Sequence, residues 1–134
     1  MDNKYIAGYF DGEGSIGLYR SLGSTDPRYL SGRKSPSWVR TVGISNTYLP
    51  TLRELYSEFG GSLRILKETD GHKKRIYSWT IGSKDSIARF LSKIVPHLRE
   101  KGPQAQLMLS IIAGKVDEFE AAIKLKELKH VLVG

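Results

Sequence analysis

A chain of 134 residues, 40% of them hydrophobic, is long enough to fold around one core, and we expect residues 1–134 to form a single domain. The absence of cysteine excludes disulfide scaffolds, cysteine-ligated zinc and thiol nucleophiles. No apolar run approaches the ~20 residues that span a bilayer, and the first ten residues lack a signal-peptide layout. We therefore expect an intracellular protein without a membrane partner.

The formal net charge is +7 and the pI is near 9.7, as in proteins that bind polyanions. The excess is confined to two stretches. Residues 14–47 and residues 60–84 each carry +4, which leaves −1 for the rest of the chain. Both stretches also show the alternation typical of strands, so the positive charge is expected on a sheet.

The first half of the chain begins with a predicted helix over residues 3–12, which the glycine-rich residues 11–14 end. Ile16 and Leu18 alternate with small or polar neighbours and predict a half-buried strand. Residues 21–37 have no period and predict a long loop.

A second strand is expected over residues 38–45, with a bulge or frayed pairing at Arg40, which falls among the apolar positions. Asn46 or Thr47 can cap the following helix, and Pro50 fits its first turn. The side chains expected on the inner face of that helix are Leu52, Leu55, Tyr56 and Phe59.

The second half of the chain starts with a predicted hairpin of residues 62–68 and 74–82 around Asp70-Gly71. Three amphipathic helices follow, and their expected inward residues are Ile87, Phe90, Leu91, Ile94 and Val95, then Leu107, Met108, Ile111 and Ile112, then Phe119, Ala122 and Ile123. Tyr77 and Trp79 share the apolar parity of Ile81 and are expected in the core. The resulting α-β-β-α-β-β-α order predicts an α+β fold, with helices on one face of an antiparallel sheet and a polar, basic open face.

The first helix carries the most specific pattern. Gly8 and Gly12 lie four residues apart on one side, although each costs roughly 0.5–1 kcal/mol relative to alanine inside a helix. Removing both side chains lets another backbone approach closely. Glu13 ends the helix at the edge of the basic sheet, where a carboxylate repels phosphate unless a metal ion stands between them.

Residues 6–14, Ile-Ala-Gly-Tyr-Phe-Asp-Gly-Glu-Gly, resemble the signature of the LAGLIDADG homing endonucleases. Ala7, Gly8, Asp11 and Gly14 match that motif by identity, and Glu13 replaces its last Asp. Residues 43–47 and 96–102 resemble two further family segments, so the likeness covers about residues 3–115.

The resemblance implies a saddle-shaped sheet and a site-specific endonuclease that cleaves both strands of DNA at a long, near-palindromic site. Because one motif copy is present, it implies a homodimer through Ala7, Gly8, Asp11 and Gly12. Glu13 and Gly12 would hold Mg²⁺ or Mn²⁺, whereas Ca²⁺ would bind without supporting cleavage. As implied catalytic residues beside Glu13, Asn46 would orient water and Lys101 would stabilise charge on phosphate.

DNA binding is expected on the open sheet face and the loop, since antiparallel ribbons fit the major groove. The candidates are Tyr19, Arg28, Arg33, Lys34, Ser37, Thr41, Arg64, Lys67, Lys74, Arg75 and Ser78.

Simpler interpretations stay open at several positions. Asn46 can be a helix cap. Lys101 by itself would be an ordinary surface lysine, because its catalytic role rests mainly on the resemblance. Two other functions also stay open, an RNA maturase that binds an intron and a non-catalytic DNA-binding regulator. Nothing in the sequence predicts a small-molecule substrate.

Overall fold

The computed structural model describes residues 2–21, 37–67 and 75–129. Along the chain they form α1 (Asn3–Glu13), β1 (Gly14–Ser21), β2 (Ser37–Asn46), α2 (Leu49–Phe59), β3 (Ser62–Lys67), β4 (Ile76–Ile81), α3 (Lys84–Ile94), the short 3₁₀ helix η2 (Val95–His97), α4 (Gly102–Ile112) and α5 (Glu118–Lys129). The predicted α-β-β-α-β-β-α order is confirmed. The predicted loop of residues 22–36 and the turn at Asp70-Gly71 lie outside the described residues.

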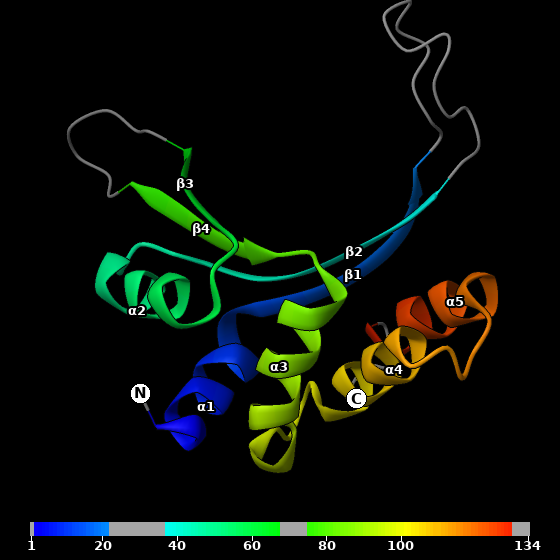
Figure 1. Ribbon diagram of the computed structural model, residues 1–134. Helices are drawn as coiled ribbons and strands as arrows, with labels where there is room; N and C mark the ends of the chain where they lie inside the picture. The colour runs from blue at the N-terminus through cyan, green and yellow to red at the C-terminus, as the bar shows by residue number, and fades with distance from the viewer. Residues whose placement is uncertain (1, 22–36, 68–74, 130–134) are drawn as a thin grey trace, which may run out of the picture.

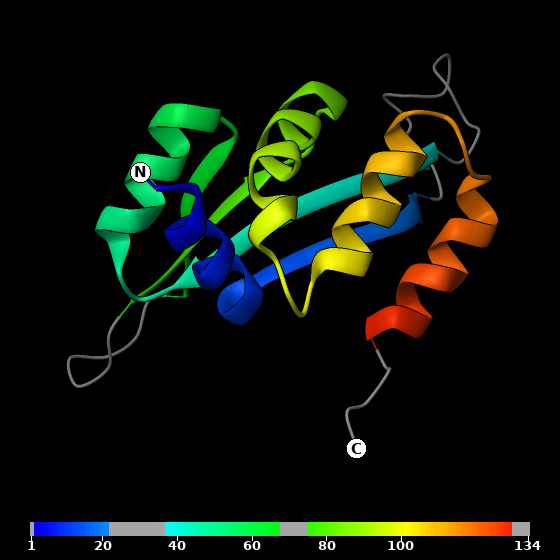
Figure 2. The ribbon, with the colours of Figure 1, turned by 90° about the horizontal axis from the view of Figure 1, so that it is seen from below.

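The four strands form one antiparallel sheet in the order β1-β2-β4-β3. The helices lie together on one face of this sheet, and the face without helices is concave (Figure 1). Figure 2, seen from below, shows the helices spread across the covered face. The predicted α+β saddle with helices on one face is therefore confirmed.

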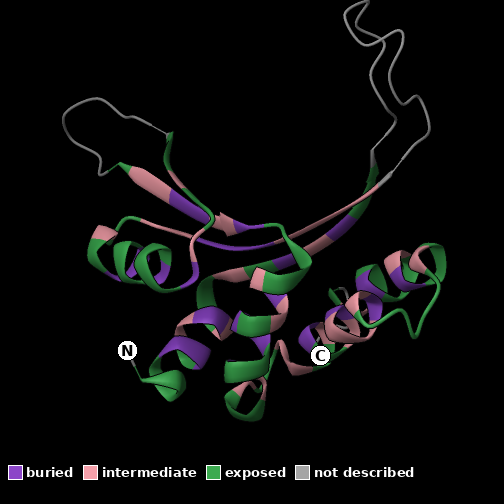
Figure 3. Ribbon diagram, viewed as in Figure 1, coloured by how far each residue is buried: buried purple, intermediate pink, exposed green. Residues whose placement is uncertain are grey.

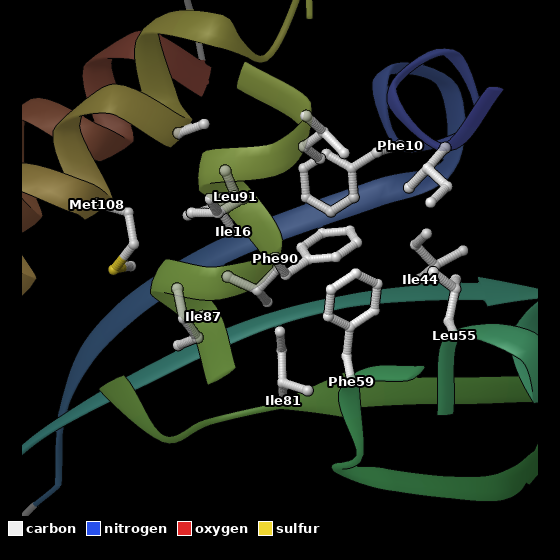
Figure 4. Packing of buried hydrophobic residues seen from close by; sticks show 14 of the residues in the cluster. Phe10, Ile16, Ile44, Leu55, Phe59, Ile81, Ile87, Phe90, Leu91 and Met108 are labelled. Atoms are coloured by element: carbon white, nitrogen blue, oxygen red, sulfur yellow. The ribbon is translucent and has the colours of Figure 1, made fainter. Parts of the chain in front are cut away.

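An aromatic cluster fills the space between sheet and helices. The ring of Phe90 on α3 lies 5.5 Å from that of Phe10, 5.0 Å from Phe59 and 5.1 Å from Trp79, centre to centre and edge to face. Figure 4 shows Phe10, Phe90 and Phe59 in a row above the sheet. All four side chains are fully or almost fully buried, which confirms the predicted core position of Trp79. Figure 3 shows how burial concentrates where helices meet strands.

The first helix begins and ends as its sequence requires. The Asp2 carboxylate accepts a hydrogen bond from the Lys4 backbone N–H at 2.8 Å and caps α1. At its other end the chain turns into β1 at Gly14, against the Phe10 ring, and a Cβ atom at that position would collide with the ring. A glycine is therefore needed for the helix to pass directly into the strand.

The bulge predicted at Arg40 is wrong. Pairing between β1 and β2 runs without interruption from Gly14↔Ile44 to Ser21↔Ser37, and the irregularity lies instead between Ile65 and Lys67 on β3. Arg40 keeps the parity of its apolar neighbours and reaches the helix-covered face. There its Nη2 donates to the Glu118 carboxylate of α5 at 3.1 Å, so a distant helix supplies the partner that the strand lacks.

The inner face of α2 is confirmed for Leu52, Leu55 and Phe59, but not for Tyr56, and α5 presents a different face from the one predicted. Tyr56 on α2 is 48% exposed, and Thr51 is buried in its place. On α5, Phe119 and Ile123 are 58% and 52% exposed, whereas Ala121 and Leu125 are buried. The ion pair to Arg40 holds the start of α5 and thereby helps set its rotation. The stripe of α3 is confirmed for Ile87, Phe90, Leu91 and Ile94, which are all buried.

No helix within the described ranges is long and apolar enough to pass through a bilayer.

Candidate active site

Lys101 and the end of α1 are joined although 90 residues separate them in the sequence. The Asp11 carboxylate accepts hydrogen bonds from the backbone N–H groups of Arg99 at 2.8 Å and Lys101 at 2.9 Å. The Lys101 ammonium donates to the Asp11 backbone carbonyl at 2.6 Å. These bonds fix the turn before α4 against the last turn of α1. Lys101 is thereby held against the last turn of α1, two residues before its end at Glu13.

Glu13 differs from Asp11 in its exposure and its hydrogen bonding. It is the last residue of α1, it is exposed, and no hydrogen bond or ion pair joins its carboxylate to another residue in the described part of the chain. Asp11 therefore acts as a structural acceptor within the protomer, whereas the Glu13 carboxylate is available to a ligand.

Asn46 ends β2 and is half-buried. Its Oδ1 accepts a hydrogen bond from the Tyr48 backbone N–H at 3.0 Å, and the Thr47 hydroxyl donates to the same atom at 3.5 Å. The predicted cap needs correction, because Tyr48 is the capping residue of α2 and its side chain makes no capping bond. Asn46 acts one step earlier, in the turn that leads into the helix, and its Nδ2 takes no part in these bonds.

Tyr9 lies on α1 one turn before Glu13. Burial raises the pKa of its hydroxyl above the ordinary value, and the nearby Tyr5 and the Glu13 charge raise the pKa further. Asn46 approaches this hydroxyl closely enough to oppose that shift, but the two groups do not reach hydrogen-bonding geometry. The hydroxyl thus stays protonated at neutral pH. Sequence analysis assigned no role to Tyr9.

A hollow opens beside Lys101. Its lining consists of Gly14, Ser15, Ile16, Lys101, Gln104 and Lys129. Partial burial lowers the pKa of the Lys129 ammonium. The sequence analysis missed Gln104 and Lys129, because no local pattern relates the end of α5 to the start of β1.

The surface of α1 that was assigned to a dimer interface is only partly available. Gly8 and Gly12 are exposed, and a Cβ atom built on either would have no neighbouring atom within 4 Å. Ala7 needs correction, because its side chain is 0% exposed inside the protomer core. Asp11 is half-buried and engaged with residues 99–101. The open side of α1 is therefore the side of the two glycines.

Several DNA-binding candidates lie on the concave face. Tyr19 is 55% exposed, and Thr41 is half-buried on the parity opposite to the buried Val42. Arg64 on β3 and Arg75, just before β4, are exposed. Ser37 begins β2 and Lys67 ends β3. Arg28, Arg33, Lys34 and Lys74 lie outside the described residues.

Ser78 needs correction as a DNA-binding candidate. It has the expected parity, but it is only 6% exposed and its hydroxyl accepts a hydrogen bond from Ser45 at 3.3 Å. Neighbouring strands cover a short side chain in the middle of the sheet, so parity alone does not make it accessible.

Metal-ligating residues are sparse within one protomer. Across residues 2–21, 37–67 and 75–129, no group of three or more His, Asp or Glu side chains converges on one point. The Glu13 carboxylate and the carbonyl of Gly12, which lies among the last carbonyls of α1, provide oxygen donors only, which suit hard divalent cations.

Residues 1–95 match the LAGLIDADG-like domain family. This chain belongs to that family. The resemblance carried by residues 6–14 is therefore confirmed.

Solved structures show the same LAGLIDADG fold. The homing endonuclease I-CvuI, in complex with the I-CreI target in the presence of 2 mM Mg with the DNA not cleaved, is 22% identical, with a TM-score of 0.69 over 98% of this chain and 82% of that chain. The archaeal intron-encoded homing endonuclease I-Vdi141I, complexed with DNA, is 16% identical, with a TM-score of 0.68 over 98% of this chain and 86% of that chain. The LAGLIDADG homing endonuclease I-SmaMI bound to cleaved DNA is 20% identical, with a TM-score of 0.64 over 94% of this chain and 43% of that chain.

Among curated proteins, no sequence matches this LAGLIDADG chain significantly.

Proposed function

We propose that this LAGLIDADG protein is a site-specific DNA endonuclease that acts as a homodimer and hydrolyses both strands of a near-palindromic duplex. The proposal depends most on one observation: the exposed Glu13 carboxylate has no partner among the described residues, and Asp11, two residues earlier on α1, holds Lys101 against the same helix. A protein that only bound DNA would gain nothing from an unpaired acid at this point, because a carboxylate repels the phosphates that the basic sheet attracts. The non-catalytic regulator is therefore the weaker interpretation.

The residues at the end of α1 fit a divalent metal ion. The Glu13 carboxylate and the Gly12 carbonyl of each protomer would hold Mg²⁺ or Mn²⁺, since both supply oxygen donors from an exposed position. Such an ion supplies a water molecule of lowered pKa and neutralises charge on the phosphate. One protomer offers a single free motif carboxylate, which supports a site shared by two chains.

Lys101 and Asn46 complete the proposed machinery. The Lys101 ammonium would donate to a non-bridging phosphate oxygen and stabilise the charge that develops there. Its bond to the Asp11 carbonyl keeps it near that oxygen before DNA binds, which reduces the entropy lost on binding. The Asn46 Nδ2 would donate to the attacking water, because its Oδ1 is held by the Tyr48 N–H.

The open side of α1 supports association of two copies. Exposed glycines at positions 8 and 12 let a second α1 approach without side chains in between. The two concave sheets would then form one extended basic surface. A two-fold axis through the paired helices implies a near-palindromic DNA site.

The test uses duplexes selected from a randomised DNA pool for binding in Ca²⁺, followed by cleavage in Mg²⁺. Sedimentation should show a dimer, and the protein should cut both strands in Mg²⁺ and not in EDTA. Glu13→Gln should lower the cleavage rate by at least about 10³-fold while binding in Ca²⁺ persists, because only the metal-holding charge is lost.

Glu54→Gln provides the matched control, since Glu54 is an exposed acid on α2, on the helix-covered side of the sheet. It should cleave at the wild-type rate. Full cleavage by Glu13→Gln, or metal-independent cleavage by the wild type, contradicts the proposal. Binding without any cleavage favours the regulator.

A further inference from the structure

We propose that Tyr9 is a positioning residue of the cleavage site, whose hydroxyl orients the Asn46 amide toward the attacking water of the DNA complex. This inference rests on the endonuclease function proposed above. It adds to Glu13, Asn46 and Lys101 a residue that touches neither metal nor phosphate.

Tyr9 lies between the part of the site on α1, which carries Glu13, and the part at the end of β2, which carries Asn46. Residues four apart on a helix share a face, so Tyr9 lies on the same face of α1 as Glu13, one turn closer to the N-terminus. Its ring packs against Tyr5, with 5.9 Å between the ring centres at a tilt of 51°. The hydroxyl at the far end of the ring reaches the region of Asn46 and Tyr48, where β2 passes into α2.

The Tyr9 hydroxyl makes no geometrically sound hydrogen bond within the described part of the protomer. Its oxygen is buried, yet it has no hydrogen-bond partner among the described residues. A buried polar group without a partner lowers the free energy of unfolding, and phenylalanine would fill the same space without that loss. Stability therefore gives no reason for tyrosine here, whereas a group that acts on a ligand or water can be retained at such a loss.

The surrounding groups define what the hydroxyl can do. Because its pKa is raised by burial, by Tyr5 and by the charge of Glu13, it remains an O–H donor at neutral pH. Asn46 Oδ1 already accepts from the Tyr48 N–H, so Asn46 meets Tyr9 with its Nδ2 donors. One Nδ2–H can donate to the Tyr9 oxygen while the other donates to water. The Tyr9 hydroxyl can then donate toward Glu13 or that water, and the amide acquires a fixed orientation.

Tyr9→Phe tests the inference, with Tyr5→Phe as the matched control. The Tyr5 hydroxyl shares a 3.4 Å hydrogen bond with Thr51 on α2 and belongs to no part of the proposed machinery. On the Ca²⁺-selected duplex, Tyr9→Phe should lower the single-turnover cleavage rate about 10–100-fold, as loss of an outer-shell partner does. Its affinity in Ca²⁺ should equal that of wild type, and its melting temperature should be equal or higher. Tyr5→Phe should cleave at the wild-type rate.

Comparison with Asn46 separates positioning from packing. In an Asn46→Ala background, Tyr9→Phe should cause no further loss of rate, because both changes remove the same orientation. The inference is overturned if Tyr9→Phe cleaves like wild type, if its stability and affinity fall together with its rate, or if the two losses multiply. Failure of the wild type itself to cleave overturns the endonuclease proposal and this inference with it. Normal wild-type cleavage with an unaffected Tyr9→Phe overturns this inference alone.

Discussion

The two faces of the sheet follow the same alternation but obey different constraints. On the covered face, Ile16, Val42 and Trp79 have no measurable exposure and pack against helices. On the concave face, Tyr19 and Arg64 are exposed, and no helix covers them. Packing therefore determines the residues of one face, whereas the other is free to carry charge and recognition chemistry. The same contrast separates two acids of α1. Asp11 is held by contacts within the protein, whereas Glu13, two residues later, is exposed.

The largest effect should come from the covered face. Phe90→Ala removes the ring that contacts Phe10, Phe59 and Trp79, and should lower the free energy of unfolding by about 3–5 kcal/mol. Urea denaturation followed by circular dichroism measures the change. Tyr19→Ala on the concave face is the control and should stay within about 0.5 kcal/mol. Equal losses for the two variants would mean that the concave face is packed as well.

A smaller effect should distinguish the two acids of α1. Asp11→Ala leaves the N–H groups of Arg99 and Lys101 without their acceptor and should lower the free energy of unfolding by about 1–3 kcal/mol. Glu13→Gln should leave it unchanged within about 0.5 kcal/mol. Thermal unfolding in the absence of metal and DNA measures both. A Glu13→Gln variant as unstable as Asp11→Ala would show that Glu13 also has a structural partner.

The smallest effect on stability should accompany a clear effect on binding. Arg64→Ala on the concave face should change the free energy of unfolding by less than about 0.5 kcal/mol. It should weaken binding to the selected duplex and reduce the salt slope by about 1, as expected for a lost phosphate contact. Fluorescence anisotropy at several salt concentrations measures this. Arg53→Ala, an exposed arginine on α2, should bind like wild type, and unchanged binding by Arg64→Ala would place recognition elsewhere.

Much of the fold could be predicted because it is encoded locally. The stripe of Ile87, Phe90, Leu91 and Ile94 has the period of a helix, and the alternation around Val42 has that of a strand. The rotation of α5 could not be predicted, because it depends on packing against distant segments, among which the Arg40–Glu118 pair joins residues 78 apart. The sequence shows Arg40 only as a charge among apolar positions.

For the candidate site, too, some features could be predicted from the sequence and others could not. The motif of residues 6–14 identified the helix, its two glycines and the acid at its end. It did not reveal that Ala7 faces the core or that Ser78 is covered by its neighbours. Those properties depend on what packs around a residue, and the periodicity of a single element contains no such information.

The sequence by itself determined the order of helices and strands, the family of the protein and the confinement of positive charge to two stretches. Only the tertiary structure decided that Asp11 holds Lys101, and that neither the Glu13 carboxylate nor the buried Tyr9 hydroxyl near Asn46 has a hydrogen-bond partner among the described residues. The physical reason is the range of the interactions. Periodicity and turn chemistry act between neighbours along the chain, whereas these contacts exist only after distant segments have packed together.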